Sequence, residues 1–305
     1  MRELMREAGF THDAAEELLA LRKQLEDEGT WDRIREMADR IMEELPKEER
    51  LRQMLQEAES WEIELGVHRY TLDLLVLLCC WGILRERYRE RNYPMEIFGN
   101  SFRDLGTKLK ECRDVYGVTG IFVGAWHDRF FDMSRFALGR LQFELVEYPL
   151  EKEFTDGERT VRKGDTVINV HIPSTGPLKK EDADEAFALA EAFYRGELFK
   201  EADCPDDFPK ERIPEGPAVF MMESWLLDPD LIGLLPDGNM KEFVRRFSVT
   251  AWEKSERFSE GWRVFGSEWE NAPGELPRRT KLQRAIADYL QKGGKLGCGL
   301  GIFIR

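Results

Sequence analysis

The sequence has few of the residues that build disulfide frameworks and metal sites. It holds four histidines and five cysteines, and the cysteines are odd in number, scattered, and never spaced as a CxxC pair. Such a pattern argues against a stapled secreted fold and against a zinc site. We therefore expect reduced thiols in a cytoplasmic protein, and we expect no metal. The five cysteines are Cys79, Cys80, Cys112, Cys204 and Cys298.

A membrane segment is also missing from the pattern. The most apolar run, residues 72–84, contains Asp73 and is far shorter than the roughly 20 residues that a membrane span needs. Residues 1–7 carry charges but no apolar core, so they do not match a signal peptide. We expect residues 72–84 to form a buried helix, and we expect no membrane partner.

Basic residues are in the minority. The chain has 45 Lys and Arg against 59 Asp and Glu, which gives a formal net charge of −14. An acidic surface disfavours nucleic acid and anionic membranes as partners, although it leaves room for a local basic pocket. We expect a small-molecule substrate and no nucleic-acid partner; a structural protein that uses its acidic helical half to bind a partner is a further alternative.

The first part of the 305-residue chain is dominated by helical spacing. Apolar residues recur three or four apart, and Gly29, Pro46 and Gly117 interrupt the pattern. Residues 1–133 therefore predict a helical N-terminal domain. The expected helices cover residues 13–28, 31–45, 48–65, 72–91 and 102–116, with a short helical turn opened by Pro94.

Near residue 134 the composition of the sequence changes to β-branched and aromatic runs separated by turn residues. Alternation in the first run puts Leu141, Phe143 and Leu145 on one face, and Arg140, Gln142 and Glu144 on the other. Strands mixed with helices predict an α+β domain with a mixed sheet over residues 134–305. The expected strands are 136–146, 166–172, 218–227, 248–252, 262–265 and 297–304; helices are expected after residue 178, over 239–247 and after Thr280, with a loop over 196–217.

One stretch organises this half, because a β-branched strand with a single histidine, His171, runs into Pro-Ser-Thr-Gly-Pro at 173–177 and then into a helix. Loop amides and a helix N-terminus together favour an anion, often a phosphate. The nucleotide fingerprints GxGxxG and GxxxxGK[ST] are absent from this stretch.

Six segments of the second half, in fixed order, resemble the GNAT-like C-terminal domain of a bacterial acyltransferase family. The segments are GRLQFE (139–144), NVHIPSTGPL (169–178), SWLL (224–227), LLP (234–236), TKLQ (280–283) and GCGLGIF (297–303). The first half is similar to that family's helical N-terminal domain. The resemblance implies acyl transfer from acyl-CoA or acetyl-CoA to an amine.

The resemblance also implies where the CoA would bind. GNAT proteins hold pyrophosphate with a [QR]xxGx[GA] loop, and the corresponding segment 173–177 has one glycine. Ser174, Thr175 and Gly176 are the expected phosphate contacts, whereas Pro177 offers no N–H. Arg278 and Arg279 are expected to bind a further cofactor phosphate, because cations at a helix start oppose the helix dipole. The alternative for this basic pair is a solvated turn.

Acyl transfer to an amine needs a base, and two residues are candidates. His171 ends a strand where ligands collect in α/β layers, although a structural histidine that ties the loop to a neighbouring strand is the alternative. Glu223 follows an apolar run and is expected to be at least half buried, which suits a base; the alternative is an outward-facing residue.

Arg140, Gln142 and Trp225 complete the candidate site as substrate-binding residues. A guanidinium beside an amide can orient a carboxylate or phosphate, unless this face is simply solvated. Trp225 lines a pocket or belongs to the core. The sequence predicts an acyl-CoA-dependent N-acyltransferase, with a non-catalytic ligand-binding or regulatory module as the alternative. It indicates neither the acyl chain, the acceptor nor the oligomeric state.

Overall fold

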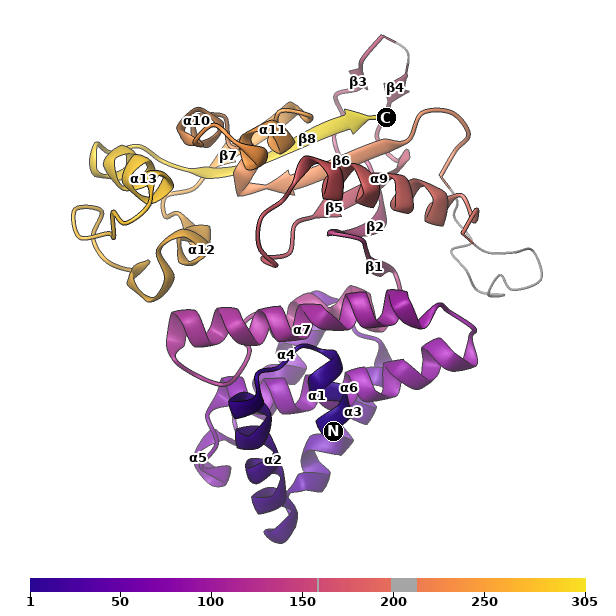
Figure 1. The fold of residues 1–305 in the computed structure, drawn as a ribbon, viewed down its shortest axis with the longest axis vertical. Coiled ribbons are helices and arrows are strands. Elements are labelled where there is room, and N and C mark those ends of the chain that lie inside the picture. The colour runs from indigo at the N-terminus through magenta and orange to yellow at the C-terminus, as the bar shows by residue number, and fades with distance from the viewer. Residues whose placement is uncertain (158, 199–212) are drawn as a thin grey trace. The chain divides into compact units, whose positions relative to one another are not determined.

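The computed structural model describes residues 1–157, 159–198 and 213–305 of the chain. They form two compact units (Figure 1). The first unit is Met1–Leu138, and the second begins at Gly139 and takes up the rest of the described chain. Each unit has its own core.

The first unit is helical, as the spacing of apolar residues predicts. Its one strand-like segment among the described residues is β1, Arg135–Leu138, at its end. The helices are α1 (Arg2–Glu7), α2 (His12–Asp27), α3 (Trp31–Glu44), α4 (Glu48–Glu59), α5 (Glu62–Leu65), α6 (Arg69–Glu90), α7 (Met95–Tyr116) and α8 (Asp128–Phe131), with a 3-10 turn, η1, at Gly124–His127.

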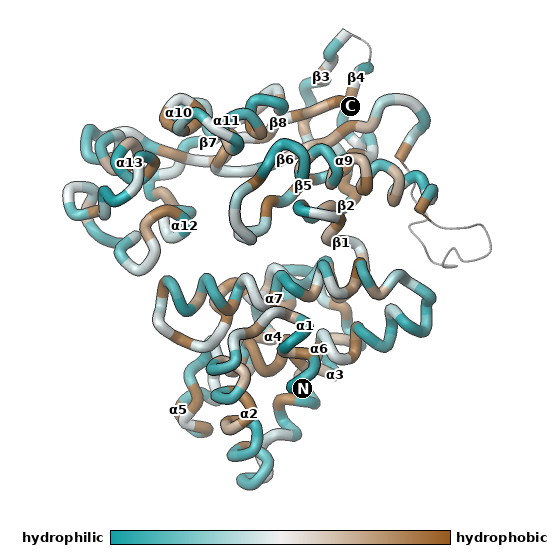
Figure 2. The backbone as a smooth tube through the Cα atoms, in the orientation of Figure 1, coloured by the Kyte–Doolittle hydropathy of each residue, from teal (hydrophilic) through white to brown (hydrophobic). Residues whose placement is uncertain are grey.

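Two long helices, α6 and α7, form the core of this unit. The predicted buried helix is confirmed within α6, whose leucines are largely inaccessible and whose apolar residues recur along it in Figure 2. Trp81 of α6 stacks on Phe102 of α7 with ring centroids 5.0 Å apart, and Phe98 meets its edge at 5.8 Å. Aromatic contacts of this kind add to the free energy gained by burial. No helix in the described part of the chain has the length and apolar character needed to cross a membrane.

The separate turn predicted at Pro94 is wrong, because α7 runs unbroken from Met95 to Tyr116. Pro94 is its N-cap, a position where a missing N–H costs nothing. Gly106 interrupts the apolar pattern for a packing reason: a Cβ there would lie 2.0 Å from the carbonyl oxygen of Ala8. The glycine lets α7 approach the end of α1.

Asp73 of α6 is a buried carboxyl that makes the stability of the first unit depend on pH. It is 3% exposed, and burial, followed by the neighbouring Glu59, raises its pKa well above the ordinary value. The folded protein therefore keeps a proton that the unfolded chain releases near pH 4, so stability declines as pH rises above that value. Asp73→Asn cannot ionise and should remove this decline.

The expected result is a melting temperature that falls less between pH 5 and pH 8 in Asp73→Asn than in the wild type. Scanning calorimetry at the two pH values measures the difference. Asp39→Asn, a change of the same kind at an exposed position of α3, is the matched control and should follow the wild type. Equal slopes for wild type and Asp73→Asn would contradict the prediction.

The second unit is built on a mixed sheet, which confirms the predicted α+β class. Its strands lie in the order β2-β5-β6-β8-β7; β5 and β6 run parallel, and the other described neighbours run antiparallel. A small hairpin, β3–β4, projects beside the end of β8 (Figure 1). The strands are β2 (Leu141–Glu147), β3 (Phe154–Thr155), β4 (Thr160–Val161), β5 (Thr166–His171), β6 (Val219–Ser224), β7 (Ser248–Lys254) and β8 (Gly297–Ile304).

Helices cover one face of this sheet. Phe187 of α9 (Lys180–Tyr194) packs against Phe220 of β6 and Phe303 of β8, with ring centroids 4.7 and 5.3 Å apart, and against Phe243 of α11 (Asn239–Val244) at 5.9 Å. The other helices are α10 (Pro229–Leu234), α12 (Trp262–Phe265) and α13 (Lys281–Gln291), whose start at Thr280 is a capping box.

The opposite face of the sheet changes character along the strands. Near the hairpin it is apolar, where Val167, Met221 and Ile302 cluster with Tyr148 and Val161. Toward the carboxyl ends of β5 and β6 it becomes polar, because the same alternation brings Asn169, His171 and Glu223 onto this face. Polar side chains on an interior sheet face mark the candidate site.

The helix predicted over 48–65 is divided into α4 and α5, and three strands predicted after residue 134 differ from the structure. The first expected strand is divided by a turn at Gly139, where φ is +64°. The expected strand 262–265 is helix α12, and the residues after Ser224 form a 3-10 turn instead of continuing β6. The loop expected over 196–217 falls mostly on residues 199–212, which lie outside the described chain together with Cys204.

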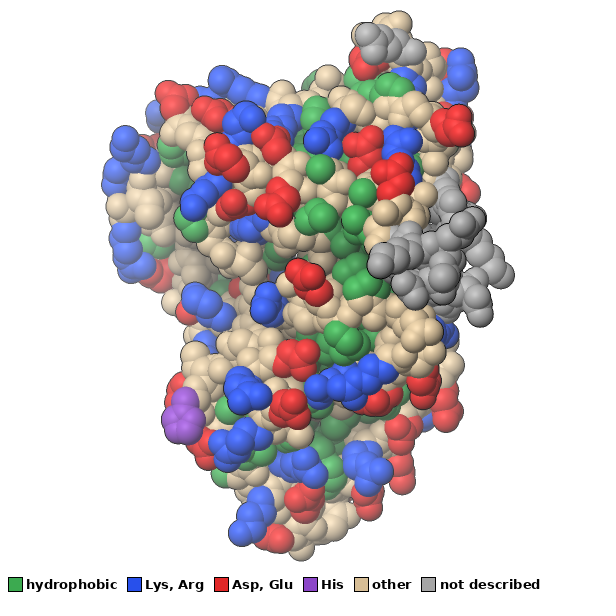
Figure 3. Space-filling model, turned by 45° about the vertical axis from the view of Figure 1, so that its right-hand side comes forward, with side chains coloured by type: hydrophobic (Ala, Val, Ile, Leu, Met, Phe, Trp, Pro, Cys, Tyr) green, Lys and Arg blue, Asp and Glu red, His purple; other side chains and the backbone are tan. Residues whose placement is uncertain are grey.

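Charged side chains of both signs are interspersed on the face drawn in Figure 3. Exposed ion pairs occur on both units, such as Arg40 with Glu57 at 3.0 Å on the first unit and Arg162 with Glu153 at 2.9 Å on the second. Exposed pairs of this kind contribute about 0–1 kcal/mol each to stability. They are solvated surface, in agreement with the alternating charges of the sequence.

Candidate active site

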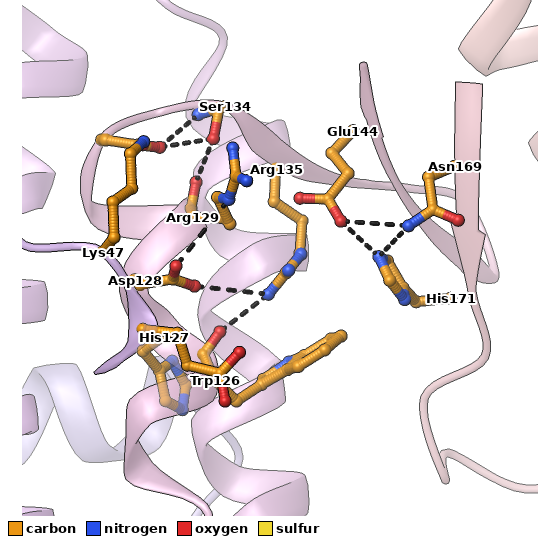
Figure 4. Close-up of polar contacts among 12 residues, drawn as sticks. Lys47, Trp126, His127, Asp128, Arg129, Ser134, Arg135, Glu144, Asn169 and His171 are labelled. Carbon is orange, nitrogen blue, oxygen red and sulfur yellow. Dashed lines mark hydrogen bonds and ion pairs between the residues drawn. The ribbon is translucent and has the colours of Figure 1, made fainter. Parts of the chain in front are cut away.

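The pairing of β2 with β5 collects polar side chains on one sheet face. Gln142 lies directly opposite His171, and Glu144 lies directly opposite Asn169. Side chains of directly opposed residues in antiparallel strands project from the same face and contact one another. Figure 4 shows Glu144, Asn169 and His171 pointing toward a common point.

The central contact is between a carboxylate and an imidazole. Glu144 Oε1 lies 2.7 Å from His171 Nε2, and Asn169 Nδ2 donates to the same carboxylate oxygen at 3.2 Å. The Glu144 side chain is 6% exposed, whereas 18% of the His171 side chain is accessible. A buried carboxylate beside a partly accessible imidazole is an arrangement that moves protons.

This contact also sets the tautomer of the imidazole. Because the Glu144 carboxylate only accepts hydrogen bonds, the proton of neutral His171 lies on Nε2 and the ring lone pair lies on Nδ1. The Asn169 amide is 3.3 Å from the same ring nitrogen, and its N–H is directed to the carboxylate instead. The buried Asn169 Oδ1 has no hydrogen-bond partner among the described residues.

Glu223, the second candidate base, stands in a different environment. It lies two residues after Met221, which is opposite Asn169 across the parallel β5–β6 pair. Glu223 is exposed on β6, which agrees with the alternative of an outward-facing residue. Alternation along an apolar strand predicts a face correctly but not how far that face is covered.

The loop after β5 contains the expected phosphate contacts, and all three are exposed: Ser174, Thr175 and Gly176. The amide of Thr175 donates to the carbonyl of Pro173 at 2.8 Å, so that amide belongs to the turn. The Ser174 backbone amide and the Ser174 and Thr175 hydroxyls are the donors suited to an anion. The α9 N-terminus follows, with Glu181 and Asp182 in its first turn.

Arg140 is not on the polar sheet face with Gln142, as alternation predicted, because it precedes β2 in the turn at Gly139. Its guanidinium donates from Nη1 to the carbonyl of Pro173 at 2.9 Å and from Nη2 to the carbonyl of Gly176 at 2.6 Å. Gln142 itself is 2% exposed beside His171. The structure thus brings Gln142 to the imidazole and Arg140 to the loop.

The remaining predicted site residues lie in the α12–α13 region and beyond β6. Arg278 pairs with Asp288 at 3.3 Å and donates to Gln291, while Arg279 pairs with Glu268 at 2.6 Å. Trp225 is partly buried, with its ring 5.5 Å from that of Phe258. A role in phosphate or substrate binding stays a prediction for these three residues.

Glu144 and Asn169 are the site residues that sequence reasoning did not select. Alternation had placed Glu144 on the polar face of its strand, and the stretch around His171 includes Asn169. The missing signal was the register, because only strand pairing reveals that Glu144 lies diagonally across from His171.

A pocket of about 560 Å³ lies within the first unit. Its lining includes Leu78, Gly82 and Ile83 together with the charged residues Arg22 and Glu86. A pocket of this size can admit a small molecule. None of the predicted site residues lines it.

Two family models account for almost the whole chain. Residues 1–133 match the N-acyltransferase N-terminal domain, and residues 136–303 match the GNAT-like C-terminal domain. The chain belongs to this acyltransferase family. The resemblance predicted from the motifs is confirmed, and the second unit is therefore the GNAT-like domain.

Solved structures share the fold of this family member. One is an acyltransferase in complex with decanoyl-CoA and teicoplanin, with a TM-score of 0.72 and 23% identity over 99% of this chain and 87% of the other. Another is an acyltransferase mutant in complex with octanoyl-CoA, with a TM-score of 0.72 and 22% identity over 99% and 86%. Identities at this level show a common fold. No curated protein sequence matches the chain.

Proposed function

We propose that this protein transfers an acyl group from an acyl-CoA to an amine of a small molecule, with His171 as the base. The observation that carries the proposal is the 2.7 Å contact between Glu144 Oε1 and His171 Nε2 on the polar face of the GNAT-like sheet. Membership of the acyltransferase family and the acyl-CoA complexes of structures with the same fold support it.

His171 would act through Nδ1. In the reaction the amine nitrogen forms a bond to the thioester carbonyl carbon, the carbon–sulfur bond breaks with its electron pair going to sulfur, and the amine loses a proton. CoA leaves as the thiolate and becomes the thiol by taking the proton back from the imidazolium or from water. The lone pair on Nδ1 accepts that proton, and the buried Glu144 carboxylate stabilises the imidazolium that forms. Asn169 holds the carboxylate in place through its amide.

The loop 173–176 and the start of α9 would hold the CoA phosphates. The Ser174 amide, the neighbouring hydroxyls and the N-terminal amides of a 15-residue helix supply donors and a favourable dipole. Arg278 and Arg279 would add positive charge for a more distant phosphate. Within the described chain the free thiols, Cys79, Cys80, Cys112 and Cys298, support placing this reaction in the reducing cytoplasm.

A non-catalytic binding module is the second candidate, and the loop favours it. Pro177 has no N–H, and the Thr175 amide is engaged within the turn, so the cradle offers fewer donors than a standard GNAT loop. Weak CoA binding without turnover is the behaviour that this candidate predicts.

Calorimetry with CoA, acetyl-CoA and octanoyl-CoA tests the proposal first. We expect saturable binding, and tighter binding for whichever acyl chain the site accepts. Release of free thiol from the bound acyl-CoA is then followed with a panel of amines, beginning with the glycopeptide teicoplanin because it occupies a structure of the same fold. Binding without acylation of any amine would favour the binding module, and absence of binding at millimolar CoA would remove the acyltransferase proposal.

Glu223→Gln separates the two candidate bases. We expect kcat to fall less than tenfold in this variant. Glu223 is exposed, and an exposed carboxylate lacks the buried surroundings that adapt a carboxylate to act as a general base. A general base normally contributes about 10²–10⁴-fold to the rate. Steady-state thiol release measures the effect, and a loss of 10²-fold or more would move the base from His171 to Glu223.

A further inference from the structure

Arg140 is the feature of the GNAT-like domain that the proposed reaction leaves unexplained. Its guanidinium is half-buried, its pKa is lowered by desolvation, and its Nε is buried without a hydrogen-bond partner among the described residues. Removing a guanidinium from water is costly unless hydrogen bonds replace the lost hydration. The guanidinium donates to two carbonyls of the 173–176 loop, those of Pro173 and Gly176.

The backbone around Gly139 brings Arg140 to this position. Gly139 has φ of +64°, and a Cβ there would lie 3.3 Å from Cα of Ala186 in α9, which only glycine tolerates comfortably. The chain therefore passes close to α9 immediately before Arg140. From there the side chain reaches the loop that precedes the same helix.

The two hydrogen bonds orient the peptide planes of the loop. The two terminal nitrogens of the Arg140 guanidinium donate to the carbonyl oxygens of Pro173 and Gly176, at 2.9 and 2.6 Å. In a planar trans peptide the N–H points opposite to the C=O, so the Ser174 amide is directed away from Arg140. The guanidinium also supplies a positive charge behind that amide.

We propose that Arg140 is a positioning residue that shapes the 173–176 loop for the pyrophosphate of CoA. This rests on the proposed function, since it assigns the loop's ligand as CoA. A standard GNAT loop uses additional backbone amides at this point, whereas Pro177 supplies none. Arg140 offsets that loss by fixing the direction of the Ser174 amide and by placing a positive charge behind it, on the carbonyl side of the peptide.

The test compares Arg140→Ala and Arg140→Lys with Arg162→Ala, an exposed arginine of the second unit that serves as the matched control. Charge-assisted hydrogen bonds of this kind are worth enough to weaken binding about 10- to 100-fold when both are lost. We expect this loss of CoA affinity for Arg140→Ala. Arg140→Lys should lie between it and the wild type, because an ammonium cannot span both carbonyls as a fork does.

An acyl-pantetheine substrate distinguishes a role at the pyrophosphate from a general structural role, because a structural defect would affect both substrates alike. Pantetheine has no pyrophosphate, so its acyl thioester should be used by Arg140→Ala with the same KM and kcat as by the wild type. Hydrogen exchange at the 174–176 amides should be faster in Arg140→Ala, and circular dichroism checks that the variants fold.

The possible failures are distinct. If Arg140→Ala binds CoA with the same affinity as the wild type, the inference is overturned and the proposed function stands. The same conclusion follows if Arg140→Ala loses activity equally with the acyl-pantetheine and the acyl-CoA substrate. If the wild type binds no CoA, both fall. If Arg140→Ala does not fold, Arg140→Lys decides. The inference is also overturned if Arg140→Lys binds CoA with the affinity of the wild type.

Discussion

Replacing His171 by glutamine should lower kcat by about 10²–10⁴-fold, the usual contribution of a positioned general base. Glutamine retains an N–H for the buried Glu144 carboxylate, so the hydrogen bond at this point of the sheet is preserved. It has no lone pair of comparable basicity to accept the amine proton. The fold and the acyl-CoA affinity should therefore survive while the chemistry is lost.

The measurement is steady-state thiol release with the best acyl-CoA and amine, together with the dissociation constant of the acyl-CoA. Glu144→Gln should also lower kcat, because an amide can turn its N–H₂ toward the imidazole and favour the other tautomer. His12→Gln, at an exposed position of α2, is the matched control and should leave kcat unchanged. A loss below tenfold in His171→Gln would exclude this histidine as the base.

Asp228→Ala should destabilise the GNAT-like domain by about 3 kcal/mol, because a fully buried carboxylate that caps a helix and accepts from a buried amide is lost. Asp228 is completely buried, and both of its carboxylate oxygens accept from Lys254 Nζ, at 2.6 and 2.7 Å. It also accepts from the amide of Gly297 at 2.8 Å and caps the start of α10. Alanine leaves the Gly297 amide and the first amides of α10 without this acceptor, and Lys254 keeps only Asp230, 2.7 Å from its Nζ.

Hydrogen exchange of the β8 amides reports the free energy of opening near Asp228 without requiring the two units to unfold together. Asp230→Ala is the matched control, since it removes a carboxylate from the same lysine at an exposed position. We expect that change to cost about 1 kcal/mol or less. Similar losses from the two variants would show that burial of Asp228 contributes nothing extra.

Much of this fold could be predicted because its signals are local. The helices of the first unit follow apolar spacing, and α13 begins at its predicted Thr280 cap. The errors come from short apolar runs, which strands and helices share: residues 262–265 form a helical turn, and Asp228-Pro229 starts α10 instead of only ending a strand. Asp before Pro is an N-cap signal that the sequence did contain.

Only half of the proposed active site could be predicted, for a different physical reason. His171 could be found because it ends a strand before a loop, which is a local property. Glu144 is 27 residues away along the chain, and its approach to the imidazole depends on which residues of β2 and β5 are opposite each other. A pattern of alternation gives the face of each strand but not the register between strands.

That register has a consequence for which length changes the protein can tolerate. One residue inserted within β2 or β5 would turn Glu144 or His171 to the opposite face, where Phe143 and Phe220 pack, and would separate the pair. Residues added to the connection between β3 and β4 would leave both strands in place. Related chains that keep this chemistry should therefore differ in the length of the hairpin, while the strand segments on both sides of it keep theirs.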